Sequence, residues 1–338
     1  MAIQDIYCSD AIFTKIVEEE DAAFESKTLF PIFMDYSNII LDLDEDELEE
    51  KIYAHEVYRI FNKKEVGELV PHKKFFQSID EENYCKFPTD IFLLDHEHID
   101  AEKIRLSHGC MILKKNELHL FEKLNKTYGF SFKTPVDGLQ RRNRNGSWEA
   151  FLKEVSLTPI NSAILIDSYL YKNIVDFNNF KEENLFEIVK NIIPSTLEVP
   201  FHITLVFNNS NDIINKEKSQ WVMAELTQFI EQEIGKAIEV GIITHNLNPA
   251  IHERVLLTNH HYFYSDKGFN IIRDGKVRNE TRGKIEWLYH DVAENYGTIR
   301  KEDHFDYLDV IRKQRDNNKT TGNRLCFNIG HTDNRLLS

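Results

Sequence analysis

Apolar residues in this chain fall into short runs separated by polar segments, and this pattern predicts an α/β protein. Helical periodicity marks 185–193 and 221–234, which end at Pro194 and Gly235. The strand-like runs before, between and after these helices are rich in Ile, Val, Leu and Phe, as buried strands are: 162–170, 202–207 and 237–244. Strands alternating with helices predict a sheet with parallel neighbours, covered by helices.

The first half repeats this alternation in a more acidic composition. Helices are expected at 11–26 and from 42 to 61, and a third closes at Gly109. Three short apolar runs predict strands: one that starts at Leu29 and ends at Asp35, one at 90–94 and one at 110–113. This half is therefore predicted to be a second α/β domain. In the C-terminal half, a further helix is expected at 287–296.

A polar stretch between the halves predicts the domain boundary. Residues 134–147 read TPVDGLQRRNRNGS and combine turn-forming residues with three arginines. We therefore expect an acidic α/β domain at 1–133, a linker and connecting helix at 134–155 and a second domain at 156–310. The remaining residues, 311–338, are expected to form a polar, basic tail.

Composition narrows the functional classes. The net charge of −15 over 338 residues disfavours a surface that grips nucleic acid everywhere, although a local basic patch stays open. No apolar run approaches the length of a membrane span, so we expect a cytoplasmic protein with no membrane partner. The four cysteines show no metal-binding spacing, which predicts free thiols and no structural zinc.

Candidate chemistry gathers between 249 and 270, PAIHERVLLTNHHYFYSDKGFN. Two short strands are expected, at 255–257 and 262–264, and in an extended chain His252 and Arg254 lie on one face. A guanidinium can bind two phosphate oxygens, while an imidazole can act as a base, a nucleophile or a hydrogen-bond donor. The structural alternative is a buried strand whose His and Arg satisfy neighbouring carbonyls and carboxylates.

This stretch resembles the signature of phospholipase D enzymes and their nuclease relatives, His-x-Lys, four residues, Asp, and then a Gly-containing segment with Asn. His252, Arg254 and Asn259 have the same spacing, whereas Gly268 comes two residues late and Asn270 one residue late. The stretch is most similar to the non-catalytic phospholipase D-like domain of some microtubule-interacting-and-transport proteins. The resemblance implies an α/β domain with a mixed sheet flanked by helices.

The resemblance also implies roles for these residues. In the family the His forms a covalent phosphohistidine, the Lys neutralises phosphate oxygens and the Asp supports the charged imidazole. Asn259 is neutral and cannot supply that last function, so binding is favoured over catalysis. The family needs two motifs, and one copy implies a homodimer if the protein is active. Lys276 and Arg278 follow the motif and are expected to add positive potential to a ligand site without a cofactor.

A second resemblance concerns the first half. Asp35 and Asp95 each follow an expected strand, which is similar to the acidic residues of PIN-type nucleases that hold Mg²⁺ or Mn²⁺. The alternative is that these acids cap helices and face solvent.

The functional hypothesis is a recognition protein that binds a phosphate-bearing ligand, a nucleic acid or a protein partner. By analogy with fused nuclease-like domains, it would belong to a multi-protein bacterial antiviral-defence system. The alternative is a nuclease or phosphodiesterase that uses His252 and Arg254 in a dimer or metal at Asp35 and Asp95.

Overall fold

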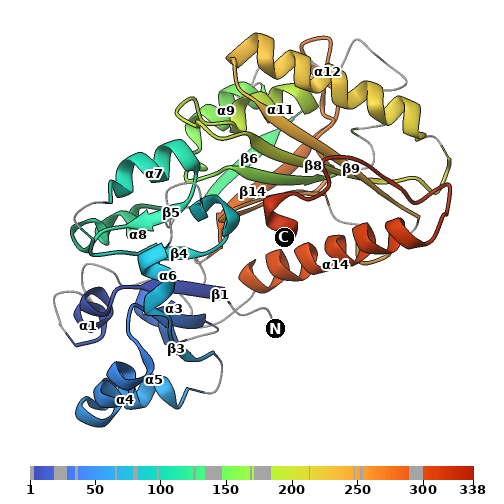
Figure 1. Cartoon of the computed structure of the whole chain (residues 1–338). Helices are drawn as coiled ribbons and strands as arrows, with labels where there is room; N and C mark the ends of the chain where they lie inside the picture. The colour runs from blue at the N-terminus through green and yellow to red at the C-terminus, as the bar shows by residue number, and fades with distance from the viewer. Residues whose placement is uncertain are drawn as a thin grey trace. The chain divides into compact units, whose positions relative to one another are not determined.

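The chain forms two compact units, each an α/β structure, which confirms the expected fold class (Figure 1). The first unit comprises Met1–Lys126 and Trp287–Asp306, and the second comprises Thr127–Glu286 and Tyr307–Ser338. The computed structural model describes residues 4–18, 29–34, 37–64, 67–78, 83–96, 99–124, 127–133, 147–167, 170, 184–212, 214–246, 248–251, 254–288 and 300–338.

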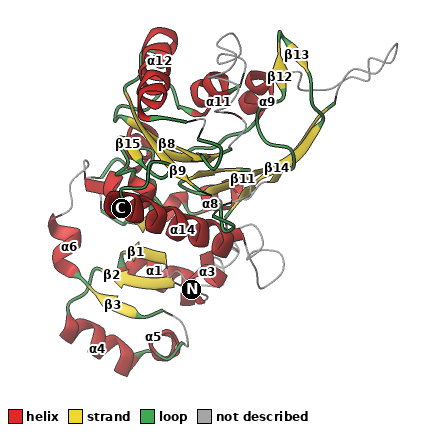
Figure 2. Ribbon diagram, turned by 90° about the vertical axis from the view of Figure 1, so that its right-hand side faces the viewer, coloured by secondary structure: helices red, strands yellow, loops and turns green. Residues whose placement is uncertain are grey.

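The first unit has a five-stranded sheet in the order β3-β2-β1-β4-β5, with every pair parallel. Figure 2 shows β1, β2 and β3 side by side. The strands are short and largely buried, as parallel strands covered on both faces are: β1 (Gln4–Cys8), β2 (Ser37–Leu41), β3 (Leu69–Pro71), β4 (Ile91–Leu93) and β5 (Met111–Leu113). The expected strand at 90–94 and the one at 110–113 are confirmed as β4 and β5.

Polar caps define the helices of this unit. Asp44 and Glu47 form a capping box at the start of α4, and Gly109 ends α7 at a φ of 66°. The expected helix at 42–61 is two helices. The helices are α1 (Asp10–Glu18), α3 (Leu29–Met34), α4 (Glu45–Ala54), α5 (Glu56–Asn62), α6 (Lys73–Ser78), α7 (Ala101–His108) and α8 (His119–Leu124), with short 3-10 turns at Asn83–Lys86 and Lys115–Glu117.

One strand prediction in this unit was wrong. Leu29–Met34 is the helix α3, because a short apolar run does not distinguish a buried helix from a strand and Pro31 fits the first turn of a helix. Asp35 therefore does not follow a strand, and it lies outside the described residues. The first strand of the sheet is Gln4–Cys8, which the sequence pattern did not identify.

The second unit is built on an eight-stranded mixed sheet in the order β15-β9-β8-β7-β10-β11-β14-β6. Strands β7, β8 and β9 are parallel, whereas β10 is antiparallel to β7, β11 to β10, and β15 to β9. A separate two-stranded hairpin joins β12 and β13. The strands are β6 (Thr127–Phe132), β7 (Ser162–Ile166), β8 (Phe201–Asn208), β9 (Ile238–His245), β10 (Val255–Thr258), β11 (His261–Ser265), β12 (Ile272–Arg273), β13 (Lys276–Val277), β14 (Thr281–Trp287) and β15 (Asn328–Gly330).

Helices α9 (Trp148–Glu154), α11 (Leu185–Ile192) and α12 (Lys216–Ile234) lie on one face of this sheet, as Figure 1 shows. Trp148 is fully buried in the core, against aromatic residues of β6 and β11. Asn215 caps α12 and Gly235 ends it at a φ of 64°. The expected order of strands and helices from 162 to 264 is confirmed.

Two segments differ from the sequence expectation. Trp287 ends β14 instead of starting a helix, and residues 289–299 lie outside the described part of the chain. Residues 311–338, expected as a tail, continue α14 (Arg300–Thr320) and form β15, which adds to the sheet beside β9. The polar composition of this end fits a helix with one exposed face and an edge strand. Among the described helices, none has the length and apolar run that crossing a bilayer requires.

Candidate functional site

Strand β10 separates two residues of the expected motif. Arg254 precedes Val255, which pairs with Ile166 at the end of β7, whereas Asn259 follows Thr258, which pairs with Ala163 near the start of β7. Five residues of extended chain span about 16 Å. Arg254 and Asn259 therefore lie at opposite ends of the strand. His252 lies outside the described residues.

Asn259 has a structural role at its end of the strand. Its side chain is fully buried, and Oδ1 accepts hydrogen bonds from the backbone N–H groups of Asn161 and Ser162, both at 3.1 Å. Its Nδ2 donates to Oδ1 of Asn161 at 3.1 Å. These bonds satisfy the backbone that leads into β7. An amide suits this position because it accepts and donates at once.

Arg254 lies close to a buried carboxylate and to Gly268. A Cβ on Gly268, whose φ is +85°, would come within 2.5 Å of Asp167 Oδ2 and 2.8 Å of Arg254 Cδ. Asp167 is 1% exposed and accepts the backbone N–H of Phe269 at 2.7 Å. Arg254 Nη1 donates to the carbonyl of Asp266 at 2.8 Å. These contacts hold the segment that follows β11 in place. They leave no room for a side chain at position 268, which explains why that residue is glycine.

Asn184 holds the next part of the same segment. Its Oδ1 accepts from the backbone N–H groups of Ile271 at 3.2 Å and Ile272 at 3.1 Å. Its Nδ2 donates to Oδ1 of Asn270 at 3.2 Å and to the carbonyl of Ile272 at 2.7 Å. The Trp148 indole N–H is shared between Asn184 Oδ1 and the carbonyl of Phe269. A buried amide thus positions the base of the β12–β13 hairpin, which Figure 2 shows near α9.

The hairpin carries a polar hollow of about 470 Å³. Its turn is Asp274-Gly275, both at positive φ, the typical sequence of a two-residue hairpin turn. The hollow brings together Asn270 and Arg278 of the predicted ligand site, whereas Lys276 on the same hairpin is not part of its lining. The lining comprises Asn270, Ile271, Ile272, Arg273, Asp274, Arg278 and Asn279.

Charge in this hollow is unbalanced in favour of cations. Asp274 Oδ2 lies 3.3 Å from Arg278 Nη2 and 3.9 Å from Arg273 Nε, so one carboxylate faces two guanidinium groups. All three side chains are about half exposed, so these ion pairs contribute little to stability. Arg278 also donates through Nε to the carbonyl of Arg273 at 3.3 Å, and the amides of Asn270 and Asn279 add further polar groups to the lining. An anion with several oxygens matches this set.

Acidic residues of the first unit lie at the carboxyl ends of its parallel strands. Asp95 follows β4, and its backbone N–H donates to Ser9 Oγ at the end of β1 at 3.0 Å. Sequence reasoning missed Asp10, after β1, and Asp42, after β2. The backbone N–H of Asp10 donates to Asp42 Oδ1 at 2.6 Å. Identifying β1 and β2 as neighbouring parallel strands would have revealed both residues.

These acids do not form a ready metal centre. Asp10 is already bound by Lys51 at 2.8 Å and by the hydroxyl of Tyr58. Burial raises the pKa of Asp42, and the charge of Asp10 adds to the effect, which disfavours the ionised form. Within the described ranges, no three acids at this edge place ligand atoms close enough to share one ion. Divalent metal at Asp35 and Asp95 stays a prediction, since Asp35 is not described.

Comparison with protein-family models gives no match, and comparison with curated proteins gives none. Among solved structures, the crystal structure of a phospholipase D family member, Nuc from Salmonella typhimurium, matches 51% of this chain and 88% of its own. The identity is 10% and the TM-score 0.24. The chain thus has a weak structural similarity to a phospholipase D family member, too weak to decide its fold family or its function.

Proposed function

We propose that this chain is a recognition protein whose second unit binds a phosphate-bearing ligand, such as the end of a nucleic acid strand. The observation that supports this most is the hollow at the β12–β13 hairpin, where Arg273 and Arg278 face one carboxylate. A guanidinium binds phosphate oxygens in a forked geometry, and two of them supply the charge of a phosphate site.

Binding is favoured over hydrolysis by the position and chemistry of Asn259. The phospholipase D-type mechanism needs a carboxylate that supports a charged imidazole. Asn259 is neutral and lies at the far end of β10 from Arg254. Its side-chain oxygen already accepts hydrogen bonds from the backbone at the start of β7. The hairpin hollow therefore offers phosphate-binding groups without that support. Such a protein would act with partners, for which a bacterial antiviral-defence system is our proposal by analogy.

A nuclease or phosphodiesterase is the second candidate. It is favoured by the all-parallel sheet of the first unit, whose acids Asp10, Asp42 and Asp95 follow three of its strands. The carboxyl ends of parallel strands are where α/β domains place ligands and metals. Such an enzyme would need Mg²⁺ or Mn²⁺, and the pairing of Asp10 with Lys51 would have to break.

Fluorescence anisotropy with a 5′-phosphorylated single-stranded oligonucleotide tests the proposal. Arg278→Gln is expected to weaken binding about tenfold, since one charge-assisted contact contributes on the order of 1.4 kcal/mol at a half-exposed site. Lys276→Gln is the matched control, because it removes a cation from the same hairpin outside the hollow. Equal losses in the two variants would indicate nonspecific attraction and contradict the proposal. Strand cleavage that a chelator abolishes would favour the second candidate.

A further inference from the structure

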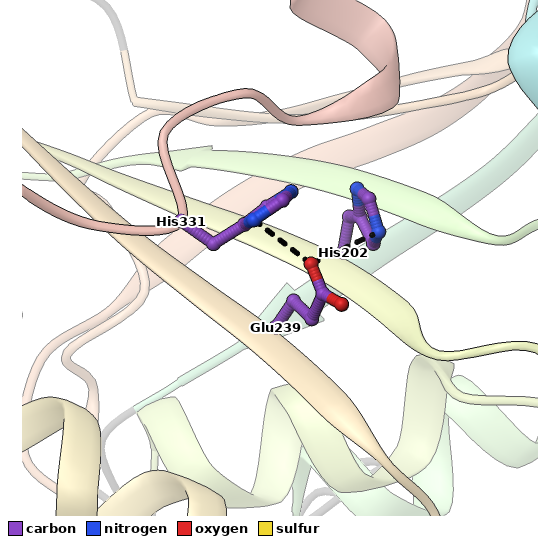
Figure 3. A group of neighbouring side chains, drawn as sticks. All are labelled: His202, Glu239 and His331. Carbon is purple, nitrogen blue, oxygen red and sulfur yellow. Dashed lines mark ion pairs between the residues drawn. The ribbon is translucent and has the colours of Figure 1, made fainter.

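Three side chains of metal-ligating type meet at the β15 end of the eight-stranded sheet, and none of them lines the hairpin hollow. His202 is the second residue of β8 and pairs with Glu239, the second residue of β9, so both side chains lie on one face of the sheet. His331 follows β15, and its backbone N–H donates to the carbonyl of Val240 at 2.9 Å. Figure 3 shows the two imidazoles and the carboxylate facing one another.

Two glycines make the close approach of His331 to β9 possible. A Cβ on Gly241 would come within 2.3 Å of the carbonyl oxygen of His331. Gly330 has a φ of +72°, and a Cβ there would meet the carbonyl of Val240 at 2.4 Å. Bulkier residues at either position would push the last strand away from β9. The backbone is therefore shaped to bring this histidine to the other two side chains.

The spacing of the ligand atoms fits one ion. Glu239 Oε2 lies 3.4 Å from His202 Nε2 and 2.9 Å from His331 Nδ1, and ligand atoms of all three residues lie within 4.8 Å of one another. Tetrahedral zinc with nitrogen and oxygen ligands at roughly 2.0–2.1 Å separates its ligand atoms by about 3.3 Å. Small side-chain adjustments would place all three around a common centre.

Hydrogen bonding around His331 points the same way. Nε2 lies 3.1 Å from the carbonyl of Asp333, and since a carbonyl only accepts, Nε2 carries the proton. In the neutral ring Nδ1 then directs its lone pair at Glu239 Oε2, 2.9 Å away, and two acceptors this close repel. A cation between them removes the conflict. A second proton on His331 would also remove it, by forming a simple ion pair with Glu239.

His202 reaches the same carboxylate from the buried side of the cluster. Its Nε2 lies 3.4 Å from Glu239 Oε2, and an imidazole nitrogen and a carboxylate oxygen are both ligands that zinc binds. His202 is 8% exposed, whereas the side chains of Glu239 and His331 are 39% and 38% exposed, which leaves the solvent side for a fourth ligand.

We propose that His202, Glu239 and His331 bind a divalent transition-metal ion of the zinc class. Two imidazoles and one carboxylate form a ligand set that zinc uses when its fourth position stays open to water or an anion. The ion would tie β15 to β8 and β9, although 92 residues separate Glu239 from His331 in the sequence. The proposal is independent of phosphate binding at the hairpin.

Titration of the full chain, first stripped with a chelator, with Zn²⁺ and with Co²⁺ tests this site. We expect one equivalent to bind, the melting temperature to rise with Zn²⁺ concentration, and Co²⁺ to show the visible absorption of tetrahedral coordination. Glu239→Gln and His331→Ala change partly exposed side chains, so the fold should survive. Each should weaken binding at least about 100-fold, more than loss of an outer hydrogen-bond partner usually does.

His119→Ala is the matched control, because it removes an exposed histidine from the other unit and should leave binding unchanged. The proposal is overturned if no saturable binding of one equivalent is observed, or if both site variants bind Zn²⁺ as the wild type does. The melting temperature of Glu239→Gln should be compared with that of the wild type, once with Zn²⁺ and once with chelator. If the variant is lower by the same amount in both conditions, the proposal is also overturned. That result would identify a plain ion pair between His331 and Glu239.

Discussion

Replacing Asn184 with Ala should destabilise the second unit and weaken ligand binding together. Asn184 is 1% exposed and serves five hydrogen bonds, three accepted at Oδ1 and two donated by Nδ2. The same side chain makes no capping bond to α11, although it stands at the start of that helix. Its polar groups are committed to the segment that carries the hollow.

The magnitude follows from the groups left without partners. Alanine removes the acceptor of the Ile271 and Ile272 N–H groups and the donor to the Ile272 carbonyl, whereas the Trp148 indole keeps the carbonyl of Phe269. A buried unsatisfied group costs about 1–3 kcal/mol. Some of the three will recover water at the hairpin, so we expect a loss of about 3 kcal/mol.

Equilibrium urea unfolding of the full chain measures this loss, with Asn191→Ala as control. Asn191 also donates through Nδ2, but to the carbonyl and carboxylate of Glu187 within its own helix, so its removal should cost less than about 1 kcal/mol. Oligonucleotide anisotropy on the same proteins should show weaker binding for Asn184→Ala alone. Equal costs in the two variants, or full binding by Asn184→Ala, would refute the role of Asn184.

Three further substitutions and conditions have definite expectations. Gly268→Ala should lower the free energy of unfolding by about 3 kcal/mol, because its Cβ would make contacts at 2.5 and 2.8 Å at an unfavourable φ. The control Gly275→Ala, at φ +66° with open space around it, should lower it by about 1 kcal/mol. Similar losses in thermal or urea unfolding of the two variants would exclude the clash. Burial lowers the pKa of His245 to about 4 from an ordinary 6.5, so between these values the unfolded chain binds a proton that the folded chain rejects. Stability should fall by about 3 kcal/mol as pH drops from 6.5 to 4, and unfolding midpoints of His245→Asn that fall just as far would exclude this cause. Asn259→Asp should restore no phosphodiester hydrolysis and should lower the unfolding midpoint, because it removes the donor to Asn161; cleavage by this variant would show that position 259 serves catalysis.

Sequence patterning predicted the second unit well because its strands are long and buried. The runs that became β7, β8 and β9 are apolar on both faces, and α12 carries its own cap and glycine stop. Patterning failed where an element is short, as in α3. It also failed for β15, since an edge strand of three residues carries little apolar signal.

The residues of the candidate sites were harder to predict from the sequence than the strands and helices. Asn270 was predicted as part of the motif and Arg278 from its closeness to the motif in sequence, and both line the hollow at the hairpin. Asn184 could not be predicted, because its partners lie 36 to 88 residues away. His202, Glu239 and His331 show no local spacing either, and only the register of β8, β9 and β15 unites them.

The most direct test of the account compares two oligonucleotides of one sequence, with a 5′-phosphate and with a 5′-hydroxyl, on wild type and on the Arg273→Gln/Arg278→Gln variant. Wild type is predicted to bind the phosphorylated strand at least about tenfold more tightly, with the difference shrinking as salt rises. The double variant is predicted to bind both strands alike. Equal affinities in the wild type, or a preference that persists in the double variant, would contradict phosphate recognition at the hairpin.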